Sequence, residues 1–142
     1  MSLRIFMWDP NGRDVPDLEG DCSFGLERYR SDLWGSSAVR RVGAEIIPRL
    51  VVGGELFVDR ADLQALEEEA RRIGDASETI AAELFDESNP GPGAVIVRGR
   101  DGANVYDVWG GKSPSESIVR YVDNLIRAID LARRVGCGIG IW

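Results

Sequence analysis

Apolar and polar positions repeat most regularly between residues 113 and 142. The stretch Ser-Pro-Ser-Glu at 113–116 combines an N-cap serine, a first-turn proline and a capping-box glutamate. Gly136 is typical of a helix end, so the pattern predicts a helix over 113–135 and a short strand over 138–142. Six apolar residues share one helical face: Ile118, Val122, Leu125, Ile126, Ile129 and Ala132. Three pairs place an acid four residues before an arginine, the order that stabilises a helix: Glu116/Arg120, Asp123/Arg127 and Asp130/Arg134.

A second apolar run covers residues 3–8 and is interrupted only by Arg4. A strand with apolar residues on both faces belongs in the interior of a sheet or between two layers. We therefore place this strand beside the strand over 138–142. Together with the helix, this arrangement predicts an α+β (or α/β) fold with a mixed sheet, in which the N- and C-terminal strands are adjacent and helices pack on the sheet.

The central part of the chain is predicted to alternate between short helices and strands. Residues 24–33 are expected to form a short helix, and Ser36 or Ser37 to cap another. Residues 46–52 are too short and too apolar to distinguish a helix end from a strand. The later elements are a strand at 55–58, a helix from Asp59 to residue 73, a helix restarted by a capping box at 75–78, and a hairpin with strands at 94–97 and 105–109 around a turn at 100–102.

Length and charge limit the classes of protein that this chain can belong to. A chain of 142 residues forms one domain, here residues 1–142, and buries enough surface to fold without a disulfide or a metal. The net charge of −7 and the lack of clustered lysine and arginine argue against nucleic acid as a partner. No membrane span is expected, because no run of 18 apolar residues occurs. The N-terminal residues lack the pattern of a signal peptide, so we expect a cytoplasmic protein in which Cys22 and Cys137 are free.

The residue types exclude the commonest catalytic and cofactor sites. The chain has no histidine, which removes Ser-His-Asp and Cys-His catalysis. Cysteine spacing for zinc is missing, and the acids of residues 9–22 do not have the spacing of a calcium loop, so no metal or other cofactor is expected. Gly136, Gly138 and Gly140 follow a predicted helix, whereas a nucleotide loop follows a strand and opens a helix. We instead expect these glycines to end the helix and to let another element approach the last strand.

Two acidic segments are candidates for binding a partner. The loop over 9–22 has five acids and one base, Arg13, and turn chemistry accounts for its Asp-Pro and Asn-Gly pairs. The second segment is the triple glutamate at 67–69, which could also be a solvated helix face. The candidate partner-binding residues are Asp9, Asp14, Asp17, Glu19, Asp21, Glu67, Glu68 and Glu69. The acidity either serves solubility alone or attracts a basic partner.

Aromatic residues at the ends of predicted elements are a further feature. The four tryptophans are Trp8, Trp34, Trp109 and Trp142. We expect most of them to be half-buried at the rim of the core, where the indole N–H can reach a partner. Binding surfaces also use aromatic residues in such positions.

Two stretches resemble small acidic bacterial immunity proteins, which neutralise toxins delivered between competing bacteria. The first runs from GAEIIPRL at 43–50 to ELFVDRADLQALEEE at 55–69, where a short strand leads into an acidic helix. The second runs from NLIRAIDLA at 124–132 to GIGIW at 138–142, a long helix followed by a strand. The resemblance implies a non-catalytic protein that binds a basic toxin domain. The alternatives are a non-catalytic subunit or adaptor of a cytoplasmic complex and, third, an enzyme that uses a carboxylate pair.

Overall fold

The computed structural model describes residues 2–102, 104–111 and 113–142, with the side chains of 53, 94–99, 101 and 104–111 left out of the description. The elements in chain order are β1 (Ser2–Trp8), β2 (Ser23–Leu26), the π-helical turn η1 (Arg30–Trp34), α1 (Ser37–Arg41), the 3₁₀ turn η2 (Ile47–Arg49), α2 (Leu50–Gly53), β3 (Leu56–Val58), the 3₁₀ turn η3 (Arg60–Asp62), α3 (Leu63–Asp75), α4 (Ser77–Leu84), β4 (Ala94–Asp101), β5 (Asn104–Gly111), α5 (Pro114–Val135) and β6 (Gly138–Ile141). Within these described residues, no helix has both the length and the apolarity needed to cross a membrane.

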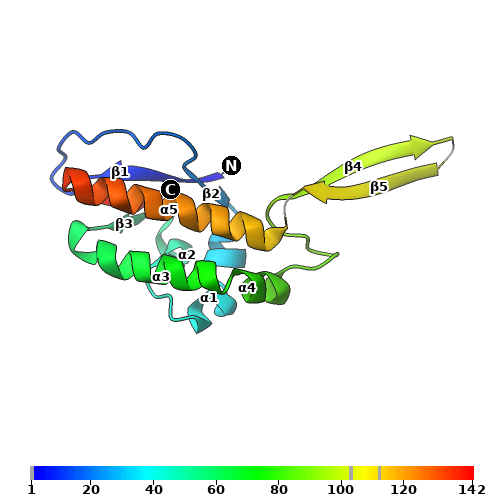
Figure 1. The fold of residues 1–142 in the computed structure, drawn as a ribbon, viewed down its shortest axis with the longest axis horizontal. Helices are drawn as coiled ribbons and strands as arrows, with labels where there is room; N and C mark the ends of the chain where they lie inside the picture. The colour runs from blue at the N-terminus through cyan, green and yellow to red at the C-terminus, as the bar shows by residue number, and fades with distance from the viewer. Residues whose placement is uncertain (1, 103, 112) are drawn as a thin grey trace.

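A four-stranded antiparallel sheet forms the centre of the fold, in the order β2-β1-β6-β3. The predicted α+β fold with adjacent terminal strands is confirmed, since β1 pairs with β6, with Ile5 opposite Ile141 and Trp8 opposite Gly138. The sheet is antiparallel throughout rather than mixed. Figure 1 shows α5 and α3 side by side on one face of this sheet. The hairpin β4–β5 forms a separate two-stranded sheet that extends away from the helices (Figure 1).

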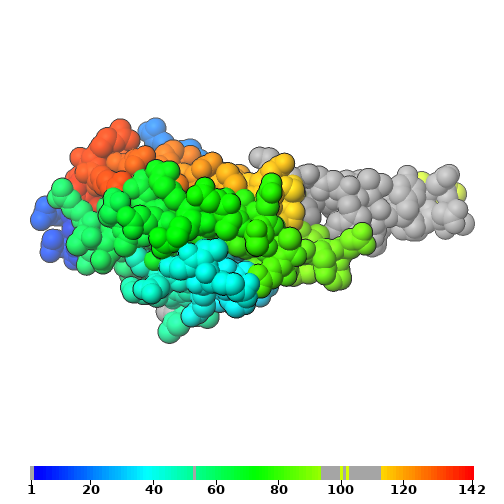
Figure 2. Space-filling view, turned by 60° about the horizontal axis from the view of Figure 1, so that its bottom comes forward, coloured from blue at the N-terminus to red at the C-terminus, as the bar shows by residue number. Residues whose placement is uncertain are grey.

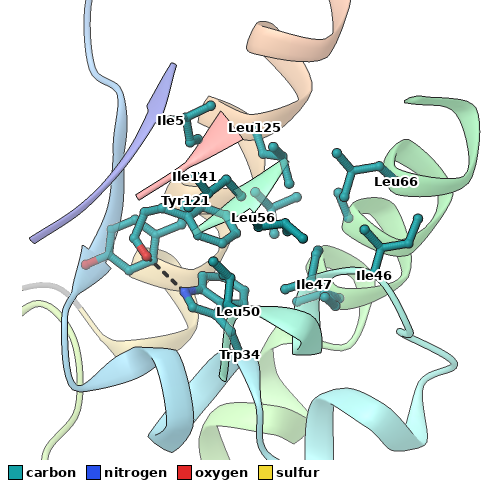
Figure 3. Packing of buried hydrophobic residues seen from close by; sticks show 14 of the residues in the cluster. Ile5, Trp34, Ile46, Ile47, Leu50, Leu56, Leu66, Tyr121, Leu125 and Ile141 are labelled. Atoms are coloured by element: carbon teal, nitrogen blue, oxygen red, sulfur yellow. Dashed lines mark hydrogen bonds between the residues drawn. The ribbon is translucent and has the colours of Figure 1, made fainter. Parts of the chain in front are cut away.

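The core lies between one face of the sheet and the helices. Along β1, Leu3, Ile5 and Met7 are buried while the alternate residues are more exposed, as the two-residue period of a strand requires. Figure 3 shows Trp34, Tyr121 and Leu125 gathered with Ile5, Ile141 and Leu56 at this interface. Ile126, predicted to point inward, is only partly buried. Tyr121, Asn124 and Ala128 are buried instead, so the buried face of α5 is wider than predicted.

The long C-terminal helix forms with the predicted ends. Ser113 is the N-cap, and its hydroxyl accepts from the backbone N–H of Glu116 at 3.3 Å. Gly136 ends the helix with φ 78°, a left-handed conformation that favours glycine. The predicted pairs along the helix are replaced by other contacts: Arg120 pairs with Asp21, and Arg127 donates to the Asp21 carbonyl oxygen. Asp130 lies 3.9 Å from Arg133 rather than pairing with Arg134. Arg120 and Arg127 therefore hold the loop over 9–22 against α5 rather than stabilising the helix internally.

The segment over 24–33 differs from its prediction. It begins as strand β2, which pairs with β1, and becomes helical only at Arg30. The ring of Phe24 stacks on Trp34 with centroids 4.0 Å apart, and the Trp34 indole N–H donates to the Phe24 carbonyl oxygen at 2.9 Å. Gly25, with φ 102°, lies against the ring of Tyr29. Long-range pairing and aromatic packing thus override the local helical spacing of the apolar residues.

Other local predictions are confirmed or refined. Residues 46–52, for which helix and strand were both possible, are helical as η2 and the start of α2. The helix capped by Ser36 is confirmed, since its hydroxyl accepts from Val39 N–H at 3.3 Å. The predicted capping box at 75–78 is wrong, because α3 continues through Gly74 and the N-cap of α4 is Ala76. The hairpin is confirmed with longer strands, whose last described pair is Asp101 with Asn104.

Candidate protein-binding surface

The face of the sheet opposite the core carries the candidate site. Phe6 and Trp8 alternate with the buried residues of β1 and so lie on this outer face. Phe57 is directly aligned with Gly140, which is in turn aligned with Phe6. Trp142 exchanges two backbone hydrogen bonds with Arg4, of 2.7 and 2.9 Å. Directly opposed residues share a face, so Trp142 lies on the outer side too.

We call Phe6, Trp8, Phe57 and Trp142 the aromatic platform. The rings of Phe6 and Phe57 meet edge to face, with centroids 6.1 Å apart, and those of Trp8 and Phe57 are 4.9 Å apart. Phe57 is 45% exposed and Trp142 is 65% exposed, while Phe6 and Trp8 are partly buried. Aromatic pairs of this kind fix each other's orientation. The platform is therefore an ordered apolar surface in contact with solvent.

The glycines of β6 allow the rings to lie close to the sheet. A Cβ atom at Gly140 would overlap the ring of Phe6, and one at Gly138 would overlap the carbonyl oxygen of Val58. This confirms the prediction that these glycines permit close approach of another element. The rings cover the glycines, and both glycines are buried.

The acidic loop over 9–22 runs along the β1 side of the platform. A groove between them is lined by residues of both, including Arg4, Phe6, Asp17, Leu18 and Trp142. Val15 and Leu18 of the loop are partly buried against the core. The loop is thus packed on the body by these apolar residues, and its polar residues border the platform.

Asp9 and Asp21, at the two ends of the loop, have polar partners within the protein. Asp9 accepts from the Asn11 N–H at 2.8 Å and lies 3.6 Å from the Arg13 guanidinium. Asp21 accepts from Arg120 at 2.6 Å, and this hydrogen bond is the main reason why the pKa of Asp21 lies far below its usual value. The candidate residues Asp9 and Asp21 therefore have structural partners.

The middle of the loop carries the acids that remain available. Asp14, Asp17 and Glu19 are exposed. Glu55 and Asp59, which flank β3 on the other side of the platform, are also exposed. The structure therefore brings Asp17 from the loop and Glu55 and Asp59 from the β3 segment to the border of one apolar surface, an arrangement that the sequence did not reveal.

The triple glutamate on α3 has a different role from the predicted solvated face. Glu69 is 4% exposed, and its carboxylate accepts from the backbone N–H groups of Ile46 and Ile47 at 2.9–3.1 Å. Glu67 is buried between Arg133 at 2.8 Å and Arg71 at 2.9 Å. Hydrogen bonding to Arg133, followed by Arg71, lowers the pKa of Glu67. The solvated-face interpretation is wrong for both residues; Glu68 is exposed.

The triple glutamate lies on the helical side of the body and not on the outer face of the sheet. In Figure 2, α3 in green and the neighbouring segment around α1 in cyan form a continuous surface. Since α3 packs on the core face of the sheet (Figure 1), Glu67, Glu68 and Glu69 lie away from the loop. The candidate residues predicted from the sequence therefore belong to two separate regions.

The tryptophans also occupy different environments. Trp8 is partly buried, as predicted for most of the tryptophans, whereas Trp34 is completely buried and Trp142 is mostly exposed. The side chain of Trp109 lies outside the described residues. Alternation of aromatic residues at 6 and 8, and the glycines at 138 and 140, were the sequence signals that could have indicated the platform.

The described part of the chain has few other groups that could form a metal site or a reactive thiol. No three acidic or thiol side chains there are close enough together to hold a metal ion. Cys137 is buried, and burial raises the pKa of its thiol. The sulfur of Cys22 accepts from Arg4 at 3.1 Å. The platform and its acidic border are therefore the feature on which a functional argument can rest.

Comparison with known proteins gives no match: no family model, no curated protein and no solved structure corresponds to this chain.

Proposed function

We propose that this protein is a non-catalytic protein-binding domain and that the outer face of its sheet is the contact surface. The observation that carries the proposal is the aromatic platform, with Phe57 and Trp142 exposed on an ordered sheet face. Phenylalanine and tryptophan are enriched at the centres of protein interfaces, where a few aromatic residues supply most of the affinity. Strands also hold such side chains more rigidly than loops do, which lowers the entropy lost on binding.

The charge around the platform favours a basic partner. Asp17 lines the groove on the loop side, and Glu55 and Asp59 flank Phe57 on the β3 side. Asp14 and Glu19 are further exposed acids of the same loop. Arg4 is the basic residue within the groove. An acidic rim around an apolar centre attracts a positively charged protein and orients it during encounter.

A basic toxin domain fits this description, and it is the partner that the resemblance to bacterial immunity proteins implies. Toxins that cut nucleic acid carry basic clefts that hold phosphate. An acidic protein can block such a cleft without any chemistry of its own. We therefore propose that the chain inhibits a cognate toxin in the cytoplasm by covering its active site.

The test measures binding between the protein and the purified product of the adjacent gene. Phe57→Ser and Trp142→Ser remove exposed aromatic rings and should each weaken binding by about 30-fold or more, as expected for the central residues of an interface. Val52→Ser is the matched control, because Val52 is 88% exposed and lies on α2. Equal affinities for the wild type and both platform variants would contradict the proposal.

Inhibition separates the proposed function from the adaptor alternative. An immunity protein should abolish the activity of the bound product at equimolar concentration, and the platform variants should restore that activity. Binding through the platform without any inhibition would instead indicate a subunit or adaptor. Failure of the isolated protein in hydrolase assays does not discriminate, because both alternatives predict it.

A further inference from the structure

Strand β3 is an edge of the four-stranded sheet and pairs only with β6 among the described strands. Arg4 and Trp142 exchange two backbone hydrogen bonds, and this pair fixes which residues of β1 and β6 are bonded to each other. In an antiparallel pair, residues that exchange two bonds alternate with residues that exchange none. Phe6 and Gly140, two residues further along, therefore form the next bonded pair between β1 and β6.

The same alternation determines how β3 is bonded. Since the peptide groups of Gly140 point toward β1, those of Ile139 and Ile141 point toward β3. Their partners are Val58 and Leu56, so these two residues are bonded to β6. Phe57 lies between them, and its N–H and C=O point toward the open edge. Among the described residues, no loop or turn backbone forms a hydrogen bond with Phe57.

The other side of the sheet is not open in this way. On β1, the N–H of Ile5 points away from β6 and donates to the Cys22 carbonyl oxygen at 2.9 Å. Strand β2 is the edge on this side of the sheet, and the carbonyl oxygens of Ser23 and Phe24 accept from the side chains of Asn124 and Trp34, both at 2.9 Å. Side chains from the body of the protein therefore occupy the edge of β2, whereas β3 presents a peptide group that can receive another strand.

The side chains along β3 indicate what kind of strand would fit. Glu55, Phe57 and Asp59 alternate with the buried Leu56 and Val58, so the three share the outer face. All three are exposed, and the backbone of Asp59 is extended, with φ −67° and ψ 157°. Directly opposed residues in a sheet interact, and opposite charges in such pairs are favourable.

We propose, on the basis of the function inferred above, that the partner adds an extended segment to the edge of β3. The segment has an apolar residue opposite Phe57 and basic residues opposite Glu55 and Asp59. Its pattern is basic-x-apolar-x-basic, with the apolar side chain lying on the aromatic platform. The central residue exchanges two backbone hydrogen bonds with Phe57, which is the mode of strand addition to a sheet edge.

Synthetic peptides that carry this pattern test the inference in the absence of the partner protein. The probe is acetyl-Ser-Arg-Thr-Val-Thr-Arg-Ser-amide, titrated into the isotope-labelled protein to about 1 mM, where weak contacts are measurable. Chemical shifts of the amides at 55–59 should change, and hydrogen exchange at Phe57 should slow. Replacing both arginines by glutamate should abolish the shifts, as should Glu55→Gln combined with Asp59→Asn in the protein. Glu68→Gln combined with Asp75→Asn on α3 is the control pair and should have no effect.

Backbone methylation of the peptide identifies strand addition directly. N-methylation of the central valine removes the donor to the Phe57 carbonyl oxygen and should abolish binding. N-methylation of either threonine alters a group that points away from β3 and should be tolerated. Equal loss with both methylations, or no binding of the arginine peptide, would overturn the inference. The proposed function would still stand if Phe57→Ser and Trp142→Ser weakened binding of the protein partner, so the two failures are distinguishable.

Discussion

The phenyl ring of Phe6 lies over Gly140, its cross-strand neighbour in β6. A methyl group at position 140 would overlap this ring, so Gly140→Ala should displace Phe6 from the platform. We expect a loss of about 1–3 kcal/mol in the free energy of unfolding, the usual cost of inserting a methyl group into a packed contact. Urea unfolding followed by circular dichroism measures this loss.

A double substitution separates the ring overlap from a general effect on β6. If the overlap is the cause, Gly140→Ala should cost much less in a Phe6→Ala background than in the wild type. The coupling free energy between two such neighbours is about 0.5–3 kcal/mol. Additive losses of unfolding free energy would show that the Phe6 ring does not overlap a methyl group at position 140.

Glu69 should be the most sensitive residue of the triple glutamate. Its carboxylate accepts from the N–H groups of Ile46 and Ile47 in a buried site. Glu69→Gln removes the charge and one acceptor oxygen, and should cost about 1–3 kcal/mol in unfolding free energy. Glu68→Gln on the exposed side of α3 should change stability by less than about 0.5 kcal/mol. A comparable loss for both variants would contradict the role of Glu69 as the buried acceptor for these two N–H groups.

The fold was predictable wherever local pattern and tertiary packing agree. The capped helix between Ser113 and Gly136 is the clearest case, because its end signals and its apolar face are contained in contiguous sequence. Strand β2 is the opposite case: Leu26, Tyr29 and Leu33 have helical spacing, yet pairing with β1 and the Phe24–Trp34 stack determine the structure. Those contacts join residues that are too far apart in the sequence for a local pattern to indicate them.

The candidate site was predictable only in part, for a similar reason. The acids of the loop are visible in the sequence, but their role depends on partners far along the chain, such as Arg120 for Asp21. Glu67 and Glu69 look like a charged helix face until the packing of Arg133 and Ile46 is known. The platform combines β1, β3 and the residue after β6, so its existence depends on strand order.

Acid should destabilise the protein partly through Asp21 and Glu67. Hydrogen bonds from Arg120 and Arg133 lower the pKa values of these two carboxyl groups in the folded state. A lowered folded pKa gives stability that is present above the unfolded pKa of about 4 and is lost as the pH falls through the folded pKa. The double variant Asp21→Asn with Glu67→Gln should therefore be less stable than wild type at pH 7, with the difference shrinking below about pH 4.

Urea unfolding at a series of pH values measures this difference. Glu68→Gln serves as the control, because the Glu68 side chain is exposed and accepts only from Gln64, at 3.2 Å, among the described residues. A constant difference between the double variant and wild type at every pH would exclude the two ion pairs as a source of acid sensitivity.

Trp34 should tolerate neither loss of its ring nor loss of its N–H. The indole N–H donates to the Phe24 carbonyl oxygen within the core, and the ring stacks on Phe24. Trp34→Phe keeps an aromatic ring but leaves that carbonyl without its partner and opens space beside it. We expect a loss of about 2–4 kcal/mol, the sum of an unsatisfied buried acceptor and a small cavity. Calorimetric unfolding measures the loss, with Trp142→Phe as the control, because Trp142 is 65% exposed.

The acids in the middle of the loop should act on the rate of association rather than on folding. Asp14, Asp17 and Glu19 are exposed, so replacing them with asparagine and glutamine should leave unfolding free energy within about 0.5 kcal/mol of wild type. Asp21 is left unchanged, because its pair with Arg120 anchors the loop.

Rim charges speed encounter with an oppositely charged protein, and salt screens them over about 10 Å at 0.1 M. The triple variant should therefore bind the partner more slowly at low salt and show a weaker dependence of the association rate on salt, while the dissociation rate stays near that of wild type. Surface plasmon resonance at two ionic strengths measures all three quantities. The triple variant Glu68→Gln, Asp75→Asn and Glu78→Gln removes three exposed acids from α3 and α4 and so controls for net charge alone. If this control slowed association as much as the loop variant did, overall charge rather than the loop would be steering the encounter.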